Sequence, residues 1–183
     1  MVGMIVVILV GFGAKTFWQN QAKNFSDSSP IKSIPVEKIT LTSSAFEDSG
    51  TIPSKYTCDG DNISPPIEIG GVPAEARTLA LIMDDPDAPS GTWVHWVKFN
   101  IPPETKNIEE GKEPLGISGK GSEDNISYQG PCPPSGEHHY VFTVYALDTF
   151  LKLESGASKK EVESAMAGHL LAKGRMVGLY SRK

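Results

Sequence analysis

Cysteine and positive charge are both scarce in this chain. Its 183 residues include two cysteines, which excludes a dense disulfide scaffold and a four-cysteine zinc site. The 17 Lys and Arg residues are outnumbered by 22 Asp and Glu residues, and the formal net charge is −5. Because an acidic chain is poorly suited to neutralising many phosphates, we expect no nucleic-acid partner. The sequence also contains no internal repeat and no heptad pattern, which argues against a repeat architecture or a coiled coil.

The composition that remains is typical of one folded domain rich in loops. Hydrophobic residues make up 39% of the chain and charged residues 21%, enough apolar material for a packed core. The 18 glycines and 14 prolines favour turns and loops over a helical bundle. The length fits a single domain, since domains run at roughly 100–200 residues each.

The N-terminus is apolar but too short to be an ordinary membrane-spanning helix. Residues 1–14 read MVGMIVVILVGFGA, without a charged or polar side chain. A run of 10–14 apolar residues is typical of a signal-peptide core, whereas a full span needs about 20. We therefore predict a signal peptide or an N-terminal membrane anchor over residues 1–18. The alternatives are a buried first strand and a start codon assigned too early.

A polar linker is predicted over residues 19–35, because QNQAKNFSDSSP offers little to pack. The folded domain then covers residues 36–183. The predicted location is extracytoplasmic, either secreted or anchored through the apolar segment. If that segment is not a signal, the predicted location is the cytoplasm.

Within the domain the hydrophobic pattern is mostly that of strands. Short runs rich in β-branched and aromatic residues alternate with Gly and Pro clusters, which indicates a β-rich fold whose central strands are buried on both faces. The expected strands cover residues 38–42, 78–83, 93–101, 139–147 and 176–180. One helix is predicted after Ser158, which forms a capping box with Glu161. An apolar stripe through His169 and Leu170 extends this helix toward Gly174.

Polar side chains concentrate where three of these strands begin or end. Asp85 and Asp87 follow the second strand, His95 lies near the start of the third, and His138 and Tyr140 lie at the start of the fourth. In a strand His138 and Tyr140 point to one face and His139 to the other. We expect these groups to form a small polar pocket between proline-shaped loops.

Such a pocket suits a small anion. Protonated His95 or His138, the Tyr140 hydroxyl and backbone N–H groups around Gly130 would donate to phosphate or carboxylate oxygens. The aspartates would repel an anion, so we expect them to orient the imidazoles or to accept from an amine. A zwitterionic head group would satisfy both halves of the pocket.

The same segments resemble those of a known family. The motif DPDAP at Asp85–Pro89, His95 within WVHW, and residues 130–148 (GPCPPSGEHHYVFTVYALD) are similar to the phosphatidylethanolamine-binding proteins. Residues 51–73 (TIPSKYTCDGDNISPPIEIGGVP) also resemble the prokaryotic, Raf-kinase-inhibitor-like branch of that family. The resemblance covers residues 39–180.

The resemblance implies a Greek-key β-fold with a central antiparallel sheet, a second sheet and a few peripheral helices. It implies a binding protein without a cofactor, which takes phosphatidylethanolamine head groups or other phosphorylated ligands. Inhibition of a protein kinase or a protease is also implied. The implied ligand-binding residues are Asp85, Asp87, His95, Gly130, Pro131, His138 and Tyr140.

The resemblance also brings the loops of Cys58 and Cys132 toward the same end of the sheet. If the chain is exported, a disulfide between them is expected. The alternative is a pair of reduced thiols.

Other function classes stay open at this point. A metal-dependent hydrolase could use Asp85, Asp87, His95 and His138, which are suitable ligand types for zinc, although no HExxH helix is present. Ser135 is a weaker candidate as a nucleophile because it lacks a GxSxG elbow. A third class is an inhibitor that acts through the outer surface of the domain.

Overall fold

The computed structural model describes residues 37–182. The predicted signal peptide or anchor (1–18) and the predicted linker (19–35) lie outside these residues. No helix within the described range is both long and apolar enough to cross a membrane.

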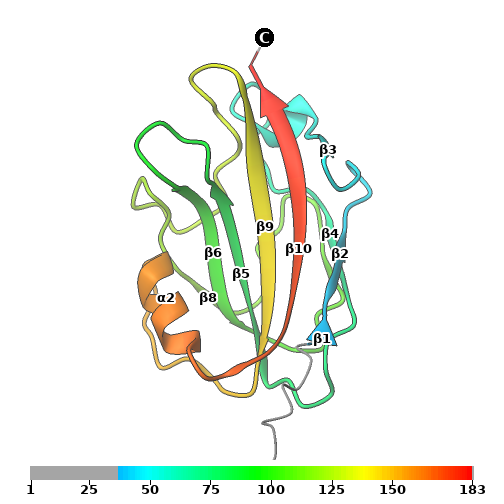
Figure 1. The fold of residues 1–183 in the computed structure, drawn as a ribbon, viewed down its shortest axis with the longest axis vertical. Coiled ribbons are helices and arrows are strands. Elements are labelled where there is room, and N and C mark those ends of the chain that lie inside the picture. Colours follow the sequence, from blue (N-terminus) through cyan, green and yellow to red (C-terminus); the bar gives the residue numbers. More distant parts are fainter. Residues whose placement is uncertain (1–36, 183) are drawn as a thin grey trace, which may run out of the picture. The chain divides into compact units, whose positions relative to one another are not determined.

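The described chain is built mainly from strands (Figure 1). Two short helices interrupt them: the 3₁₀ helix η1 (Ser54–Tyr56) and the α-helix α2 (Lys159–Met166). The strands are β1 (Glu37–Lys38), β2 (Thr40–Thr42), β3 (Gly50–Thr51), β4 (Ile67–Gly70), β5 (Thr78–Asp85), β6 (Trp93–Ile101), β7 (Asn107–Ile108), β8 (Ile117–Ser118), β9 (Glu137–Leu147) and β10 (Leu170–Ser181).

Two sheets contain these strands. The larger, seven-stranded sheet has the order β1-β10-β9-β5-β6-β8, with β3 also paired to β10. Each of its central strands β10, β9, β5 and β6 is antiparallel to its neighbour. The smaller sheet has the order β2-β4-β7. The predicted mainly β fold, with a central antiparallel sheet and a second sheet, is therefore confirmed.

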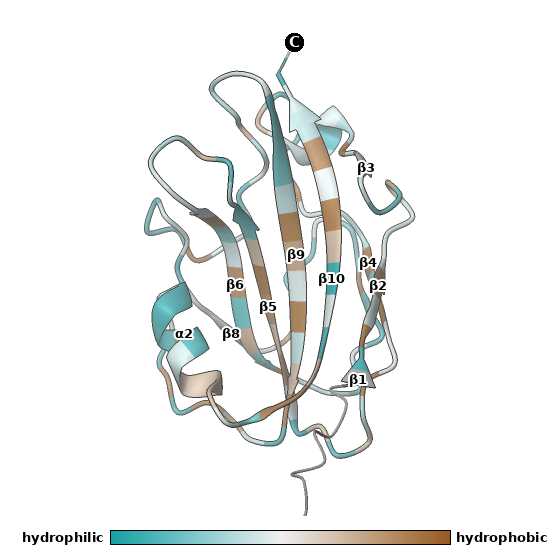
Figure 2. Cartoon of the chain, in the orientation of Figure 1, coloured by the Kyte–Doolittle hydropathy of each residue, from teal (hydrophilic) through white to brown (hydrophobic). Residues whose placement is uncertain are grey.

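The large sheet is packed on both faces at its strand β5. Leu79, Leu81 and Met83 point into the core shared with the small sheet. Ala80 and Ile82 point to the other side, into a smaller cluster that includes Val162 and Met166 of α2. The uninterrupted apolar run in β5 follows from this double burial. Along β9, by contrast, buried residues alternate with more exposed ones, because only one face is fully covered. The strand is hydrophilic where it begins and carries hydrophobic residues further along (Figure 2).

The helix begins as predicted but ends early. Ser158 accepts from the backbone N–H of Glu161, and the Glu161 carboxylate accepts from the backbone N–H of Ser158. The predicted extension through His169 and Leu170 is wrong, because the helix stops at Met166. Gly168 adopts a left-handed φ of 81°, and the chain then enters β10, which pairs along β9.

His169 is consequently no packing residue. Its Nδ1 donates to a carboxylate oxygen of Asp148 at 2.8 Å, and both side chains are about half exposed. Gly174, predicted to end the helix, lies inside β10. A Cβ atom at this position would overlap the carbonyl oxygen of Ile39 and the side chain of Leu41.

Candidate functional site

A cavity of about 460 Å³ opens where the end of β5 meets the beginnings of β6 and β9. Loops around residues 58–62, 88–90 and 129–134 complete its walls. The lining residues are Cys58, Asn62, Asp85, Ala88, Pro89, Ser90, Trp93, His95, Glu123, Gln129, Gly130, Cys132, Pro133, Pro134, His138 and Tyr140. Five of the seven predicted ligand-binding residues are among them, and Asp87 and Pro131 are not.

The alternation of β9 decides which of its side chains face the cavity. His138 and Tyr140 are buried and line it, while His139 between them is exposed on the opposite side of the strand. The register with β5 continues to Val141, opposite Asp84, so Asp85 lies close to the start of β9. The predicted parity of these three residues is confirmed.

His138 and Asp85 form a buried pair. The Nδ1 of His138 lies 2.7 Å from Oδ2 of Asp85, and each side chain is less than a tenth exposed. The other carboxylate oxygen of Asp85 accepts from the backbone N–H of Asp87 at 2.8 Å. Since the carboxylate accepts at Nδ1, the imidazole has only Nε2 left for a ligand, and in the imidazolium form Nε2 donates.

His95 is held differently. Its Nδ1 lies 2.9 Å from the carbonyl oxygen of Gln129. A carbonyl only accepts, so Nδ1 carries the hydrogen and a neutral ring presents the lone pair of Nε2. Burial lowers the pKa of His95, against the opposing effects of the Gln129 carbonyl and the Asp85 carboxylate. His95 is therefore an acceptor at neutral pH, which corrects the expectation that it donates to an anion.

Tyr140 is fully buried, and its hydroxyl has no hydrogen-bond partner among residues 37–182. Burial, and then the negative charge of Asp85, raises the pKa of Tyr140, so the hydroxyl stays protonated. The Cys132 backbone partly offsets this effect but makes no hydrogen bond of ordinary geometry. The ring meets that of His95 edge to face, with 5.2 Å between centroids. An unsatisfied buried hydroxyl is costly, so a group that accepts from it in the cavity would be stabilised.

Asp87 lies outside the cavity. Its Oδ2 accepts from both the backbone N–H and Nδ1 of His139, at 2.8 and 2.7 Å. These hydrogen bonds, the backbone one foremost, lower the pKa of Asp87. The residue orients an imidazole as expected, but that imidazole is on the outer side of β9.

Gly130 shapes a wall and has no free donor. Its N–H donates to Oδ1 of Asn62 at 2.8 Å, which corrects the expectation that it donates to a bound anion. A Cβ atom at Gly130 would overlap the backbone of Tyr56 and Thr57, so only glycine permits this close approach. Pro131 is buried behind the wall, and its carbonyl accepts from the N–H of Cys58 at 3.0 Å.

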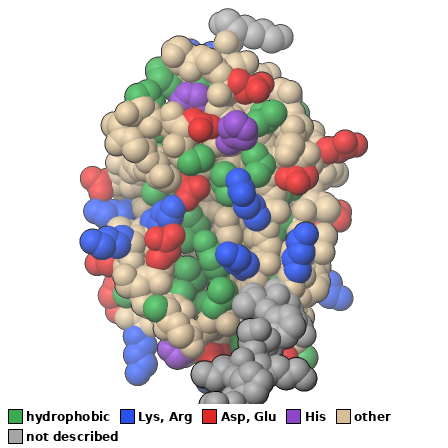
Figure 3. Space-filling model, viewed as in Figure 1, with side chains coloured by type: hydrophobic (Ala, Val, Ile, Leu, Met, Phe, Trp, Pro, Cys, Tyr) green, Lys and Arg blue, Asp and Glu red, His purple; other side chains and the backbone are tan. Residues whose placement is uncertain are grey.

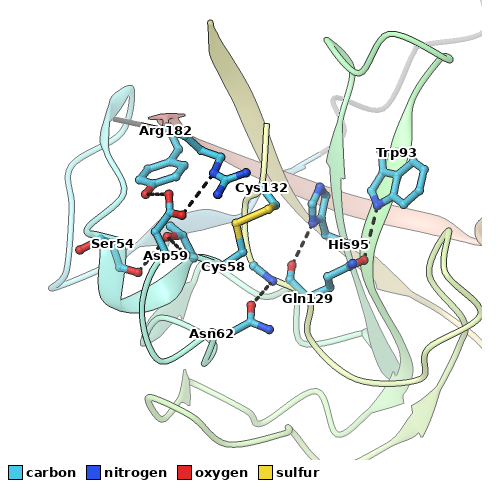
Figure 4. Close-up of a disulfide and its surroundings, with 12 residues drawn as sticks. Ser54, Cys58, Asp59, Asn62, Trp93, His95, Gln129, Cys132 and Arg182 are labelled. Carbon is cyan, nitrogen blue, oxygen red and sulfur yellow. Dashed lines mark hydrogen bonds and ion pairs between the residues drawn. A yellow bond between two sulfur atoms is a disulfide. The ribbon is translucent and has the colours of Figure 1, made fainter. Parts of the chain in front are cut away.

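A disulfide joins the two loops of this wall (Figure 4). Cys58 and Cys132 are separated by 74 positions in sequence, and their Cα atoms are 5.4 Å apart. Both cysteines line the cavity. The hydroxyl of Tyr128 also donates to the carbonyl of Tyr56 at 2.8 Å, which ties the same two segments together.

Sequence reasoning missed a second group of lining residues. Figure 4 shows Gln129 between Trp93 and His95. Its side-chain oxygen accepts from Trp93 Nε1 at 3.4 Å, and its Nε2 donates to Glu123 at 2.6 Å. Asn62 was also missed. It lies four residues after Cys58, within a motif that carries the family resemblance, and that position could have marked it as a candidate cavity residue. Nothing in the local pattern singles out Glu123.

A metal-dependent hydrolase finds little support in this geometry. Within residues 37–182 no three His, Cys, Asp or Glu side chains converge as metal ligands would. Asp85 and His138 bind each other, and Asp87 is committed to His139.

Comparison with known proteins gives a consistent picture. Residues 42–181 match the family model described as phosphatidylethanolamine-binding protein. A UPF0098 protein of Methanothermobacter thermautotrophicus is 55% identical over 150 residues, which cover 79% of this chain and 99% of that protein. A UPF0098 protein of Pyrococcus horikoshii is 49% identical over 158 residues, covering 80% and 79% respectively.

Two crystal structures are also similar. A phosphatidylethanolamine-binding protein homologue from Chlamydia trachomatis aligns with a TM-score of 0.77 and 40% identity. YbcL of E. coli, described as a member of the mammalian family of these proteins, aligns with a TM-score of 0.74 and 28% identity. Each alignment covers 80% of this chain and 99% of the other.

Proposed function

The chain belongs to the phosphatidylethanolamine-binding protein family, and we propose that its cavity binds a small molecule with a phosphate or carboxylate group. The ligand class that suits the cavity best is a zwitterionic phosphoethanolamine-type head group. The observation that carries the proposal is the buried hydroxyl of Tyr140 on the cavity wall, which forms no hydrogen bond with any described residue.

The anionic half of the ligand would accept from two donors. The Tyr140 hydroxyl donates one hydrogen bond, and Nε2 of His138 donates another when the ring is protonated. The pairing with Asp85 at 2.7 Å fixes the orientation of that ring. None of the described Lys and Arg residues lines the cavity, so among them a free dianion finds no permanent cation to balance it, whereas a zwitterion brings its own positive charge.

The cationic half would meet acceptors. Glu123 is exposed at the rim, and Nε2 of neutral His95 offers a lone pair inside the cavity. Between these polar groups Trp93 and three prolines supply apolar contact. A few placed polar groups in an otherwise apolar wall are the usual composition of a small-molecule site.

The proposal describes a binding module and includes no reaction. Inhibition of a protein kinase or protease stays a prediction, because no feature of the described residues identifies a target. An extracytoplasmic location also stays a prediction; the exposed disulfide beside the cavity supports it, since such bonds persist mainly in oxidising compartments.

The test is calorimetric titration with glycerophosphoethanolamine, whose phosphodiester does not titrate near neutral pH. We expect Tyr140→Phe to weaken binding by about 10- to 100-fold, because a hydrogen bond to a charged group contributes roughly 1.5–3 kcal/mol.

Tyr145→Phe is the matched control, since Tyr145 lies on the opposite face of β9 and does not line the cavity. The free energy of unfolding should not drop in Tyr140→Phe, because the deleted hydroxyl makes no hydrogen bond. Equal affinities of the two variants would defeat the proposal. Stoichiometric zinc binding with hydrolysis that is lost in His95→Ala would favour the hydrolase instead.

A further inference from the structure

The outer face of the large sheet carries a second depression, of about 850 Å³. It shares no lining residue with the cavity, and the two lie on opposite sides of β9. Three cations dominate it: Lys38 of β1, and Lys173 and Arg175 of β10, all exposed. Together with Thr143 and Tyr145 of β9 they form what we call the basic face. Its existence is unexpected in a chain with a formal charge of −5.

Strand register concentrates the positive charge. Lys38 is paired directly with Lys173 across β1 and β10. Arg175 lies two residues further along β10 and so points to the same side. Like charges placed directly opposite each other on neighbouring strands destabilise a sheet. The arrangement is therefore unfavourable for the isolated domain, and an external anion would relieve it.

Little within the domain neutralises this charge. Among residues 38–182 no carboxylate oxygen lies within 4 Å of the Lys38, Lys173 or Arg175 side-chain nitrogens, whereas Lys159 and Lys120 each have such a partner. Asp48 lines the same depression, but its Oδ1 accepts from the backbone N–H of Val177 at 2.8 Å. The basic face thus carries a net positive charge.

Partly exposed apolar side chains adjoin the cations. Val177 and Tyr145 both line the depression, and both are intermediate in exposure. Figure 3 shows Lys and Arg side chains gathered over the β9–β10 side of the molecule, with hydrophobic atoms next to them. A broad, shallow surface that combines basic and apolar groups suits the interface of a lipid bilayer better than a small soluble ligand.

We propose that the basic face lies against the surface of an anionic lipid bilayer. Lys38 is the second residue of the first strand, so the chain enters the domain at the edge of this face. The predicted anchor over residues 1–18 ends one linker away, and a flexible linker of that length has a mean reach of about 20–25 Å. A membrane-inserted anchor would hold this face, with its opposite charge, close to the lipid head groups.

The experiment compares the chemical labelling of lysines in the full chain on vesicles. With an amine-reactive reagent and mass spectrometry, we expect Lys38 and Lys173 to be labelled at least several-fold more slowly when the vesicles contain about 30% phosphatidylglycerol than when they are pure phosphatidylcholine. Roughly 0.5 M salt should remove the protection, since it shortens the screening length to about 4–5 Å. Lys106, in the loop before β7, is the internal control and should be labelled equally throughout.

A charge-matched pair of variants completes the test. Lys173→Glu/Arg175→Glu should abolish the lipid-dependent protection of Lys38, whereas Lys106→Glu/Lys112→Glu, with the same change in charge, should preserve it. Labelling of Lys38 and Lys173 that is indifferent to lipid charge would overturn the proposal. Protection by soluble polyglutamate but not by anionic vesicles would overturn it in favour of an acidic peptide partner. Glycerophosphoethanolamine binding in the cavity should be the same in both double variants, so this proposal and the proposed function fail separately.

Discussion

At the scale of single residues, two histidines in one cavity have different hydrogen-bond partners. His138 donates through Nδ1 to a carboxylate, whereas His95 donates through Nδ1 to a carbonyl. Because burial is the largest influence on His95 and lowers its pKa, charging His95 opposes folding.

The burial of His95 makes the stability of the domain depend on pH. The folded-state pKa of His95 lies below the ordinary value near 6.5, so the unfolded state binds the proton first as pH falls. The stabilising contribution of neutral His95 is complete above that value and is lost as the pH falls through the folded-state pKa. Between the ordinary pKa near 6.5 and the lower folded-state pKa, each pH unit costs about 1.4 kcal/mol of folding stability.

The measurement is urea denaturation between pH 7.5 and 5 for the unmodified protein and for His95→Asn. The Asn amide can still donate to the Gln129 carbonyl but does not titrate, so the variant should lose less stability as the pH falls. Parallel curves for the two proteins would contradict the assignment of this loss to His95.

Sequence reasoning reached part of this cavity. The strand period of two was enough to put His138 and Tyr140 on one face, because both lie inside a long, regular strand. Asp87 and Gly130 lie in loops, where no period applies and where backbone direction decides what each group meets. The bond from Gly130 N–H to Asn62 joins residues 68 apart, which no local pattern could reveal.

At the scale of elements, β10 depends on glycines at close approaches. Gly174 lets the strand pass the carbonyl oxygen of Ile39 and the side chain of Leu41. The start of β10 has a hydrophobic spacing that resembles a helix, but the chain forms a strand there. Pairing with β9 along nearly the whole length of β10 outweighs the local preference.

Gly174→Ala should therefore destabilise the domain by about 1–3 kcal/mol, the usual cost of overpacking a rigid contact. Chemical denaturation monitored by tryptophan fluorescence measures this change. Gly70→Ala is the control, because its added Cβ would meet only the Thr40 side chain at 3.9 Å. If both variants lose the same stability, the close contact with Ile39 is not the cause.

The limits of one strand, β6, were easier to predict than the end of the helix, whereas the predicted strand 38–42 is divided between β1 and β2 and the predicted strand 176–180 is the end of the longer β10. The predicted and observed limits of β6 agree, at Trp93 and Ile101, because turn residues bound an uninterrupted run of strand-forming ones. The apolar stripe of the predicted helix continued to Leu170, although Leu170 is the first residue of the next strand. Hydrophobic periodicity over so few residues does not distinguish a continuing helix from the start of a strand.

At the scale of the whole molecule, one disulfide joins segments that are otherwise far apart in the chain. The 74-residue separation means that the bond restricts a large part of the unfolded ensemble. In the loop-entropy description a closed loop of this size stabilises the folded state by roughly 4 kcal/mol.

Reduction with a thiol reagent should lower the unfolding temperature and weaken ligand binding, because Cys58 and Cys132 hold one wall of the cavity. Calorimetry with and without reductant measures both effects. Cys58→Ser/Cys132→Ser should reproduce them and be insensitive to further reductant. Unchanged ligand affinity after complete reduction would mean that the remaining hydrogen bonds, such as Tyr128 to Tyr56, suffice to shape the wall.

Strand β9 presents the cavity on one side and the basic face on the other. Inserting or deleting a single residue within it would exchange the two sets of side chains, because successive residues alternate in direction. During evolution this strand can thus change by substitution but not in length. Insertions are expected instead in the loop before Glu137, where Gly136 has open space around it, so relatives can diversify the cavity mouth while the polarity of both surfaces is inherited intact.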